Sequence, residues 1–153
     1  MTPEARLRTL GLALPPLPAP VGRFVAARAE GGLLHLSGQG PVRPDGTLAT
    51  GLVGAGVTAE EARDHARLCA LTLCAAMREA LGSLDRVAGL VRLLGFVQAA
   101  PGFARHPFVL DGASDLFHHL WGEAGRHARS AVGVASLPGN ITVEVEAVAR
   151  LSP

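Results

Sequence analysis

An arginine and two glutamates near the C-terminus, Arg129, Glu144 and Glu146, are the side chains of this sequence best suited to chemistry. They lie in two segments in which apolar residues alternate with other residue types, residues 129–136 and 141–150. Such alternation is typical of β-strands, with one side turned toward a core. The geometry that the two strands impose therefore decides what these three groups can do together.

The two segments are predicted to pair as a β-hairpin, because Leu137-Pro138-Gly139-Asn140 between them is rich in turn residues. With Pro138-Gly139 as a two-residue loop, Glu144 lies opposite Gly133 and Glu146 lies opposite Ala131. Arg129 and both glutamates then share one side of the sheet. The opposite side is predicted to be core and carries Val132, Val134, Val143 and Val145.

Two interpretations of this face remain open. An arginine and two acids above alanine and glycine leave room for a ligand, and a fixed guanidinium can hold a small carboxylate through two parallel hydrogen bonds. Alternatively, Arg129 and Glu146 form an ion pair at a subunit interface and bind nothing.

Hydrophobic periodicity and turn residues predict the elements that position this face. The clearest signal is a helix over residues 59–81, since Thr58-Ala59-Glu60-Glu61 forms a capping box and Gly82 a C-terminal stop. A second helix is predicted for residues 107–123. Further strands are predicted for residues 24–29, 33–37, 47–53 and 87–98. The resulting order is βββαβαββ, an α+β fold in which the helices pack on one face of a mixed sheet.

The first twenty residues are predicted to lie outside this arrangement. A short helix begins at Thr2-Pro3-Glu4 and ends at Gly11, and the stiff, extended segment Pro15–Pro20 follows as a strap across the body. Residues 21–153 then form one domain.

Composition excludes several classes of protein. All 14 basic residues are arginine, and with 13 acidic residues the net charge is +1 without any block of like charge, so a nucleic-acid surface is not expected. No apolar run is long enough to span a membrane, and prolines interrupt the N-terminal segment where a secretory signal needs an apolar run. We therefore expect a cytoplasmic protein with Cys69 and Cys74 as buried, reduced thiols.

Other polar residues have simpler predicted roles. Asp111 and Asp115 are expected near the start of the second helix, where acids suit its N-terminus. His118 and His119 point about 100° apart on a helix and do not form a metal site. His127 lies at the edge of the Arg129 site or on the surface.

Five short motifs connect these residues to a known family. They are Ser-Gly-Gln at 37–39, His-Ala-Arg-Ser at 127–130, Val-Gly-Val-Ala at 132–135, Leu-Pro at 137–138 and Val-Glu-Val-Glu-Ala-Val-Ala at 143–149. They resemble the signatures of the Rid family, the reactive intermediate deaminases also called YjgF-like or endoribonuclease L-PSP-like. The resemblance implies a chorismate-mutase-like fold and a homotrimeric barrel with pockets between subunits.

The resemblance also implies roles for single residues. Arg129 would bind a substrate carboxylate and Glu144 would position the water that attacks an imine carbon, while Ser37 and Gly38 would line the same pocket. Phe24 and Ala131 stand where the family has a pocket tyrosine and a cysteine, and residues 103–115 form a longer segment, which marks a divergent branch. No metal or organic cofactor is implied.

Three functions follow from this comparison of motifs. The first is hydrolytic deamination of small enamines or imines that carry a carboxylate, such as 2-aminoacrylate. The second is non-catalytic binding or sensing of a small carboxylate. Ribonuclease activity, which is claimed for some relatives, fits the near-neutral charge poorly.

Overall fold

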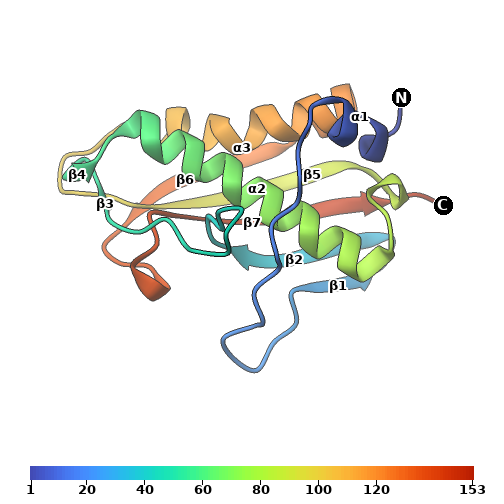
Figure 1. Cartoon of the computed structure of the whole chain (residues 1–153), viewed down its shortest axis with the longest axis horizontal. Coiled ribbons are helices and arrows are strands. Elements are labelled where there is room, and N and C mark those ends of the chain that lie inside the picture. Colours follow the sequence, from blue (N-terminus) through green and yellow to red (C-terminus); the bar gives the residue numbers. More distant parts are fainter.

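In the computed structural model, which describes all 153 residues, two long helices cover one face of a five-stranded sheet (Figure 1). The helices are α2 (Ala59–Leu81) and α3 (His106–Trp121). The strands are β1 (Ala27–Glu30), β2 (Leu33–Gln39), β5 (Val87–Gln98), β6 (Ala128–Val134) and β7 (Val143–Leu151). A short helix, α1 (Pro3–Thr9), packs at the end of the helix layer, and β3 (Leu52–Val53) with β4 (Gly56–Val57) forms a separate two-stranded ribbon. The predicted α+β arrangement with helices on one face is confirmed.

Helix α2 begins and ends where the sequence predicts. The Thr58 hydroxyl accepts a hydrogen bond from the Glu61 backbone N–H at 3.1 Å, and the Glu61 carboxylate accepts one from the Thr58 N–H at 2.8 Å. Gly82 adopts a left-handed conformation, with φ of 83°, that closes the helix. Strand β5 also has its predicted bounds, Val87–Gln98.

The strand order β1-β2-β7-β5-β6 contradicts the predicted C-terminal hairpin. Strand β5 lies between β6 and β7, pairing with β6 in parallel and with β7 antiparallel. The turn itself exists, as a 3-10 turn at Pro138–Asn140 in which Gly139 has φ of 65°. The connection is longer than the assumed two-residue loop, and it carries the chain past β5 instead of back along β6.

Two other predicted strands differ from the structure. Of residues 47–53 only Leu52 and Val53 are in a strand, while Leu48 and Thr50 make isolated bridges outside the main sheet. Strand β1 begins at Ala27, so Phe24 precedes the sheet in a bend and is half-exposed.

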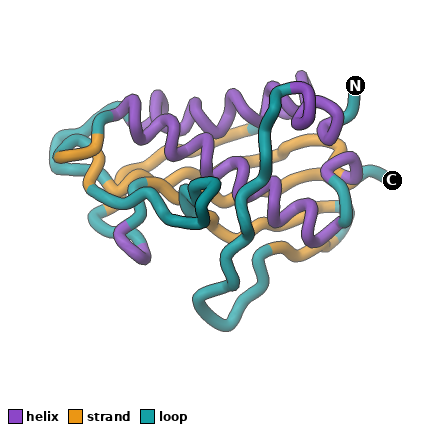
Figure 2. The backbone as a smooth tube through the Cα atoms, in the orientation of Figure 1, coloured by secondary structure: helices purple, strands orange, loops and turns teal.

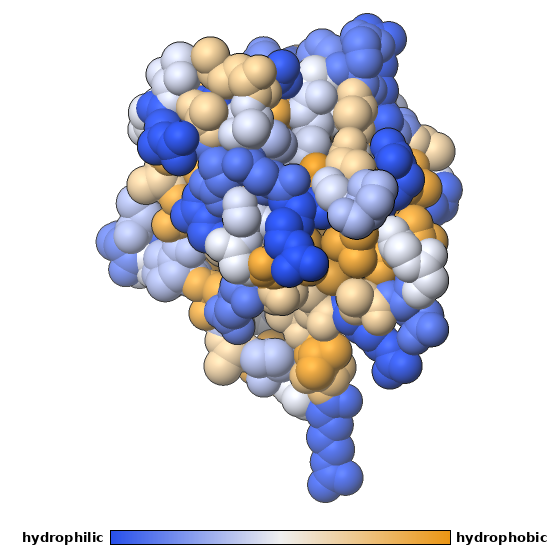
Figure 3. Space-filling view, turned by 90° about the vertical axis from the view of Figure 1, so that its right-hand side faces the viewer, coloured by the Kyte–Doolittle hydropathy of each residue, from blue (hydrophilic) through white to orange (hydrophobic).

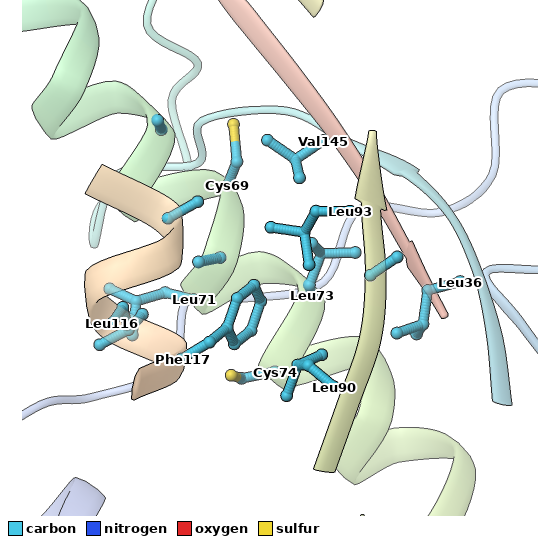
Figure 4. Close-up of a cluster of buried hydrophobic side chains, with 14 of the residues drawn as sticks. Leu36, Cys69, Leu71, Leu73, Cys74, Leu90, Leu93, Leu116, Phe117 and Val145 are labelled. Carbon is cyan, nitrogen blue, oxygen red and sulfur yellow. The ribbon is translucent and has the colours of Figure 1, made fainter. Parts of the chain in front are cut away.

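The core lies between the helix layer and the sheet. Figure 4 shows Phe117 of α3 meeting Leu73 and Cys74 of α2 and Leu90 and Leu93 of β5. Both cysteines are buried free thiols, as predicted, and burial raises the pKa of Cys74 to about 12. Large apolar side chains therefore pack both helices against β5.

The N-terminal segment consists of helix α1 followed by an extended stretch without regular structure. The Glu4 carboxylate accepts hydrogen bonds from Arg78 of α2 at 2.6 and 3.0 Å, which holds α1 against the body. The chain then crosses α2 without regular structure (Figure 2). Leu12, Leu14 and Leu17 pack against the core. On the side where both termini lie, hydrophilic and hydrophobic residues are interspersed (Figure 3). None of the helices is both long and apolar enough to cross a membrane.

Helices α2 and α3 touch at Gly112, and this contact fixes the height of α3 above the sheet. A Cβ atom on Gly112 would lie 2.0 Å from the backbone oxygen of Arg63. An alanine in the interior of a helix normally stabilises it by about 1 kcal/mol relative to glycine.

We expect Gly112→Ala to lower the free energy of unfolding by about 1–3 kcal/mol, because the helices must move apart. Urea denaturation of the two proteins measures the difference. A variant as stable as the parent, or more stable, would show that the helices do not approach this closely.

Candidate functional site

The register of the sheet places Arg129 on the face that the helices cover. Leu93 of β5 is paired with Arg129 on one side and with Ala147 on the other. Residues paired across neighbouring strands point to the same face, and Leu93 is fully buried beneath the helices. Arg129 therefore points toward α3.

Glu144 and Glu146 point to the opposite, open face. Phe96 is paired with Glu144 and with Val132, and Leu94 is paired with Glu146. The predicted single face carrying Arg129, Glu144 and Glu146 is thus wrong, as is the core position predicted for Val132, which is 41% exposed. The cause is the insertion of β5 between β6 and β7. Across β5, Glu144 is level with Val132 and not with Gly133, so the residues of β6 point to the faces opposite to those predicted.

Arg129 is held by the first half of α3. Its guanidinium donates to the Asp111 carboxylate at 2.9 Å, to the Ser114 hydroxyl at 3.0 Å and to the Pro107 carbonyl at 3.3 Å. Arg129, Asp111 and Ser114 border a pocket of about 410 Å³ whose lining also includes His118, Arg126 and His127; we call it the α3 pocket. A guanidinium with several fixed partners is oriented before any ligand arrives.

His127 completes this network. One ring nitrogen, Nδ1, lies 2.7 Å from the Gly125 carbonyl and the other, Nε2, lies 3.0 Å from the Ser114 hydroxyl. Because a carbonyl only accepts, Nδ1 carries the proton and Nε2 accepts from Ser114. Burial lowers the pKa of His127, the Gly125 carbonyl opposes this, and the nearby Arg129 charge lowers it further. The imidazole is therefore neutral at pH 7.

Glu144 borders a second cavity, on the open face, which we call the Glu144 pocket. This cavity also measures about 410 Å³, and its lining includes Gly38, Phe24, Val21 and the strap residues Pro18–Pro20. A Cβ atom on Gly38 would lie 2.8 Å from the Glu144 carboxyl carbon. Glycine at this position thus leaves the space that the Glu144 side chain occupies.

The environment of Glu144 alters its acidity. Partial burial raises the pKa of its carboxyl group, and the negative charge of Glu146 raises it further. A carboxylate with a raised pKa is a stronger base, so Glu144 is better suited than an ordinary glutamate to accept a proton from water.

The remaining predicted site residues lie in three places. The Ser37 hydroxyl donates to the Val25 carbonyl at 2.7 Å and, with Phe24, borders a hollow beside Glu146. Ala131 packs against the core and lines neither pocket. The structure therefore brings Phe24, Gly38 and Glu144 together, with Ser37 adjacent, and places Arg129 apart from them.

Sequence reasoning missed Asp111 and Ser114 as partners of Arg129. Asp111 was interpreted as a helix-start residue, but α3 begins at His106 and Asp111 faces the pocket one turn later. The available signal was the spacing of Asp111, Ser114, Asp115 and His118, which places four polar side chains on one face of a largely apolar helix. No group of three or more His, Cys, Asp or Glu residues is arranged to hold a metal ion.

Comparison with known proteins identifies the family. The family model described as "YjgF/chorismate_mutase-like, putative endoribonuclease" matches residues 4–151. The chain belongs to the YjgF family. Protein TCP17 of Trypanosoma cruzi is 45% identical over 149 residues, which cover 97% of this chain and 93% of the relative. The predicted family and its chorismate-mutase-like fold are thereby confirmed.

Solved structures of other members superpose along nearly the whole chain. A Shewanella oneidensis protein described as "a putative endoribonuclease" is 37% identical, with a TM-score of 0.94, covering 99% of this chain and 100% of the other. The structure of E. coli TdcF with bound serine is more distant, at 26% identity and a TM-score of 0.63, covering 89% and 94%.

We expect nuclear magnetic resonance titration of the side-chain carboxyl carbons to find the pKa of Glu144 above the ordinary glutamate range. Glu146→Gln should bring it down by removing the neighbouring charge, though not to the ordinary value, since burial is the larger cause. Because the folded-state pKa is raised, Glu144 favours the folded state below its unfolded pKa. That contribution is lost as the pH rises through the folded value. A normal pKa in the parent protein would contradict the burial described here.

Proposed function

We propose that the protein is a hydrolytic deaminase of small enamines or imines that carry a carboxylate. In this proposal it acts as a homotrimer, and each active site combines Arg129 of one subunit with Glu144 of its neighbour. The observation that carries the proposal is that these two residues border pockets on opposite faces of the same sheet. A second copy of the chain is the simplest way to bring them to one substrate.

The open face of the sheet supports the association of copies. Val91 and Val132 are each more than two fifths exposed, and Phe24 and Val25 are about half-exposed or more. The composition, at 48% apolar and 18% charged residues, is unusually apolar for a monomer of this size. A shared interface would cover this surface and shield Glu144 further from water.

The chemistry follows from the two groups. Arg129 makes three hydrogen bonds within the protein and has five N–H donors, so donors remain for a substrate carboxylate. Protonation of the imine nitrogen makes its carbon electrophilic, and Glu144 orients a water molecule and accepts its proton as the carbon–oxygen bond forms. Glu144 then returns this proton to the amino nitrogen of the adduct, and as the adduct's hydroxyl group loses its proton the carbon–nitrogen bond breaks, releasing a keto acid and ammonia.

The relatives give partial support. TdcF has been crystallised with serine, a small molecule with a carboxylate and an amino group, and it shares this fold. The family description names an endoribonuclease. In this chain, the candidate residues border two pockets of about 410 Å³ each, a size suited to a metabolite.

The test is release of keto acid from imines that an amino-acid oxidase generates from a broad amino-acid panel. We expect the purified protein to accelerate release. Arg129→Ala and Glu144→Gln should each lower the rate at least about a hundredfold. Both variants should keep the parent's mass in light scattering, near three times the 15.7 kDa chain.

Matched controls separate the site from general effects on the fold. Arg92→Ala removes an exposed arginine on the strand beside Arg129 and should stay within a few-fold of the parent rate. Glu146→Gln removes the charge that helps to raise the pKa of Glu144 and should lower the rate much less than Glu144→Gln does. A parent protein that binds carboxylates without turning over any imine would establish the non-catalytic alternative, and cleavage of RNA without imine turnover would establish the ribonuclease.

A further inference from the structure

The α3 pocket contains charges of both signs in equal number. Two aspartates, Asp111 and Asp115, and two arginines, Arg126 and Arg129, line it together with uncharged or titratable groups. The Asp115 carboxylate is bound to Arg63 of α2 at 2.7 Å. The Asp111 carboxylate instead stands directly beside the guanidinium of Arg129.

Asp111 is the more accessible partner of this ion pair. Its side chain is 46% exposed, whereas that of Arg129 is 20% exposed. Only Oδ1 of Asp111 accepts a hydrogen bond within the protein, from Arg129, so Oδ2 remains available to a ligand. A plain carboxylate approaching Arg129 therefore meets a negative charge within a few ångströms, which repels it.

A ligand with adjacent opposite charges satisfies both side chains. In an α-amino acid one carbon separates the carboxylate from the ammonium group, and a protonated imine has the same spacing. The Arg129 guanidinium and the Asp111 carboxylate are in direct contact, which matches this spacing.

We propose that Asp111 is the subsite for a cationic nitrogen, so that the α3 pocket selects α-amino-acid-like zwitterions over plain carboxylates. This inference rests on the proposed function in one respect, since it takes Arg129 as the group that binds the carboxylate. It adds that the nitrogen of the substrate is bound as a cation. Asp111 then favours the iminium form of an imine, which is the form that water attacks.

Ser114 and His127 keep the subsite from rearranging. The Ser114 hydroxyl accepts from Arg129 at 3.0 Å and donates to Nε2 of His127, whose Nδ1 is fixed by the Gly125 carbonyl. Arg129 is thus anchored by a chain of hydrogen bonds that does not include Asp111. A change at Asp111 can therefore alter the charge of the pocket while Ser114 still orients the guanidinium.

The test uses three stable probes with the same carbon chain and carboxylate. L-Alanine carries an ammonium group, L-lactate a hydroxyl and propionate a hydrogen at the same carbon. In calorimetric or nuclear magnetic resonance titrations we expect the parent protein to bind alanine at least about tenfold more tightly than lactate or propionate. Alanine methyl ester, which lacks the carboxylate, should bind more weakly than alanine.

Asp111→Asn is the decisive variant, because it keeps an oxygen acceptor for Arg129 and removes the charge. Its preference for alanine should fall to about unity, with lactate bound as well as before or better. If Asp111 only supports Arg129, the variant should weaken all three carboxylates equally and keep the preference. That result, or a parent protein without any preference, would overturn the proposal.

Two further variants control the comparison. Asp115→Asn removes a charge from the same pocket and the same helix face, but one already bound to Arg63, and should keep the preference for alanine. Asp111→Glu keeps the charge and should retain more of the preference than Asp111→Asn, which guards against a variant that simply folds poorly.

The outcome is separable from that of the deaminase assay. A protein that prefers alanine through Asp111 but hydrolyses no imine supports this subsite and overturns the deaminase proposal. Turnover of imines that persists in Asp111→Asn, with an unchanged preference among probes, supports the deaminase and overturns the subsite.

Discussion

The parallel pairing of β6 with β5 is the constraint on which the rest of the molecule depends. Parallel neighbours need a crossover connection, and here α3 supplies it on the face that α2 also covers. The pairing sets which residues of β6 face the helices, and it inserts β5 between the strand of Arg129 and the strand of Glu144. One chain therefore presents its cation and its raised-pKa carboxylate to different faces.

Close packing of α3 against the sheet forms the pocket around Arg129. A Cβ atom on Gly95 of β5 would lie 2.1 Å from Leu110, and one on Gly133 of β6 would lie 2.5 Å from His106. These glycines let α3 settle onto the sheet, which brings Asp111 and Ser114 within hydrogen-bond distance of Arg129. The polar residues of α3 thus form hydrogen bonds with the edge strand β6, whereas its apolar residues Leu116 and Phe117 lie in the core.

Local signals in the sequence predicted local structure well. The capping box at Thr58 and the stop at Gly82 gave the bounds of α2, and the apolar run from Val87 to Gln98 gave β5. The turn at Pro138–Asn140 was also predicted correctly, but a turn shows where a chain bends and not which strand it pairs with next. Pairing depends on contacts distant in sequence, so the hairpin and the shared face of Arg129 and Glu144 were wrong.

The candidate site was predictable to a similar degree. Family motifs identified Gly38 and Glu144, and the structure places them in contact. Asp111 could not be identified as a partner of Arg129, because its interaction depends on the height and rotation of α3. Acidic residues near the N-terminus of a helix also stabilise the helix dipole, so their presence in the sequence does not by itself indicate a partner such as Arg129.

The proposed active site takes Arg129 from one subunit and Glu144 from another. A direct test is to mix the variants Arg129→Ala and Glu144→Gln, each expected to be nearly inactive alone, and to unfold and refold them together. In a shared site, random assembly reunites an intact Arg129 with an intact Glu144 in about a quarter of the pockets. A shared site therefore predicts recovery of about a quarter of the parent's imine hydrolysis, whereas a mixture as inactive as its two components would show that the site is not shared.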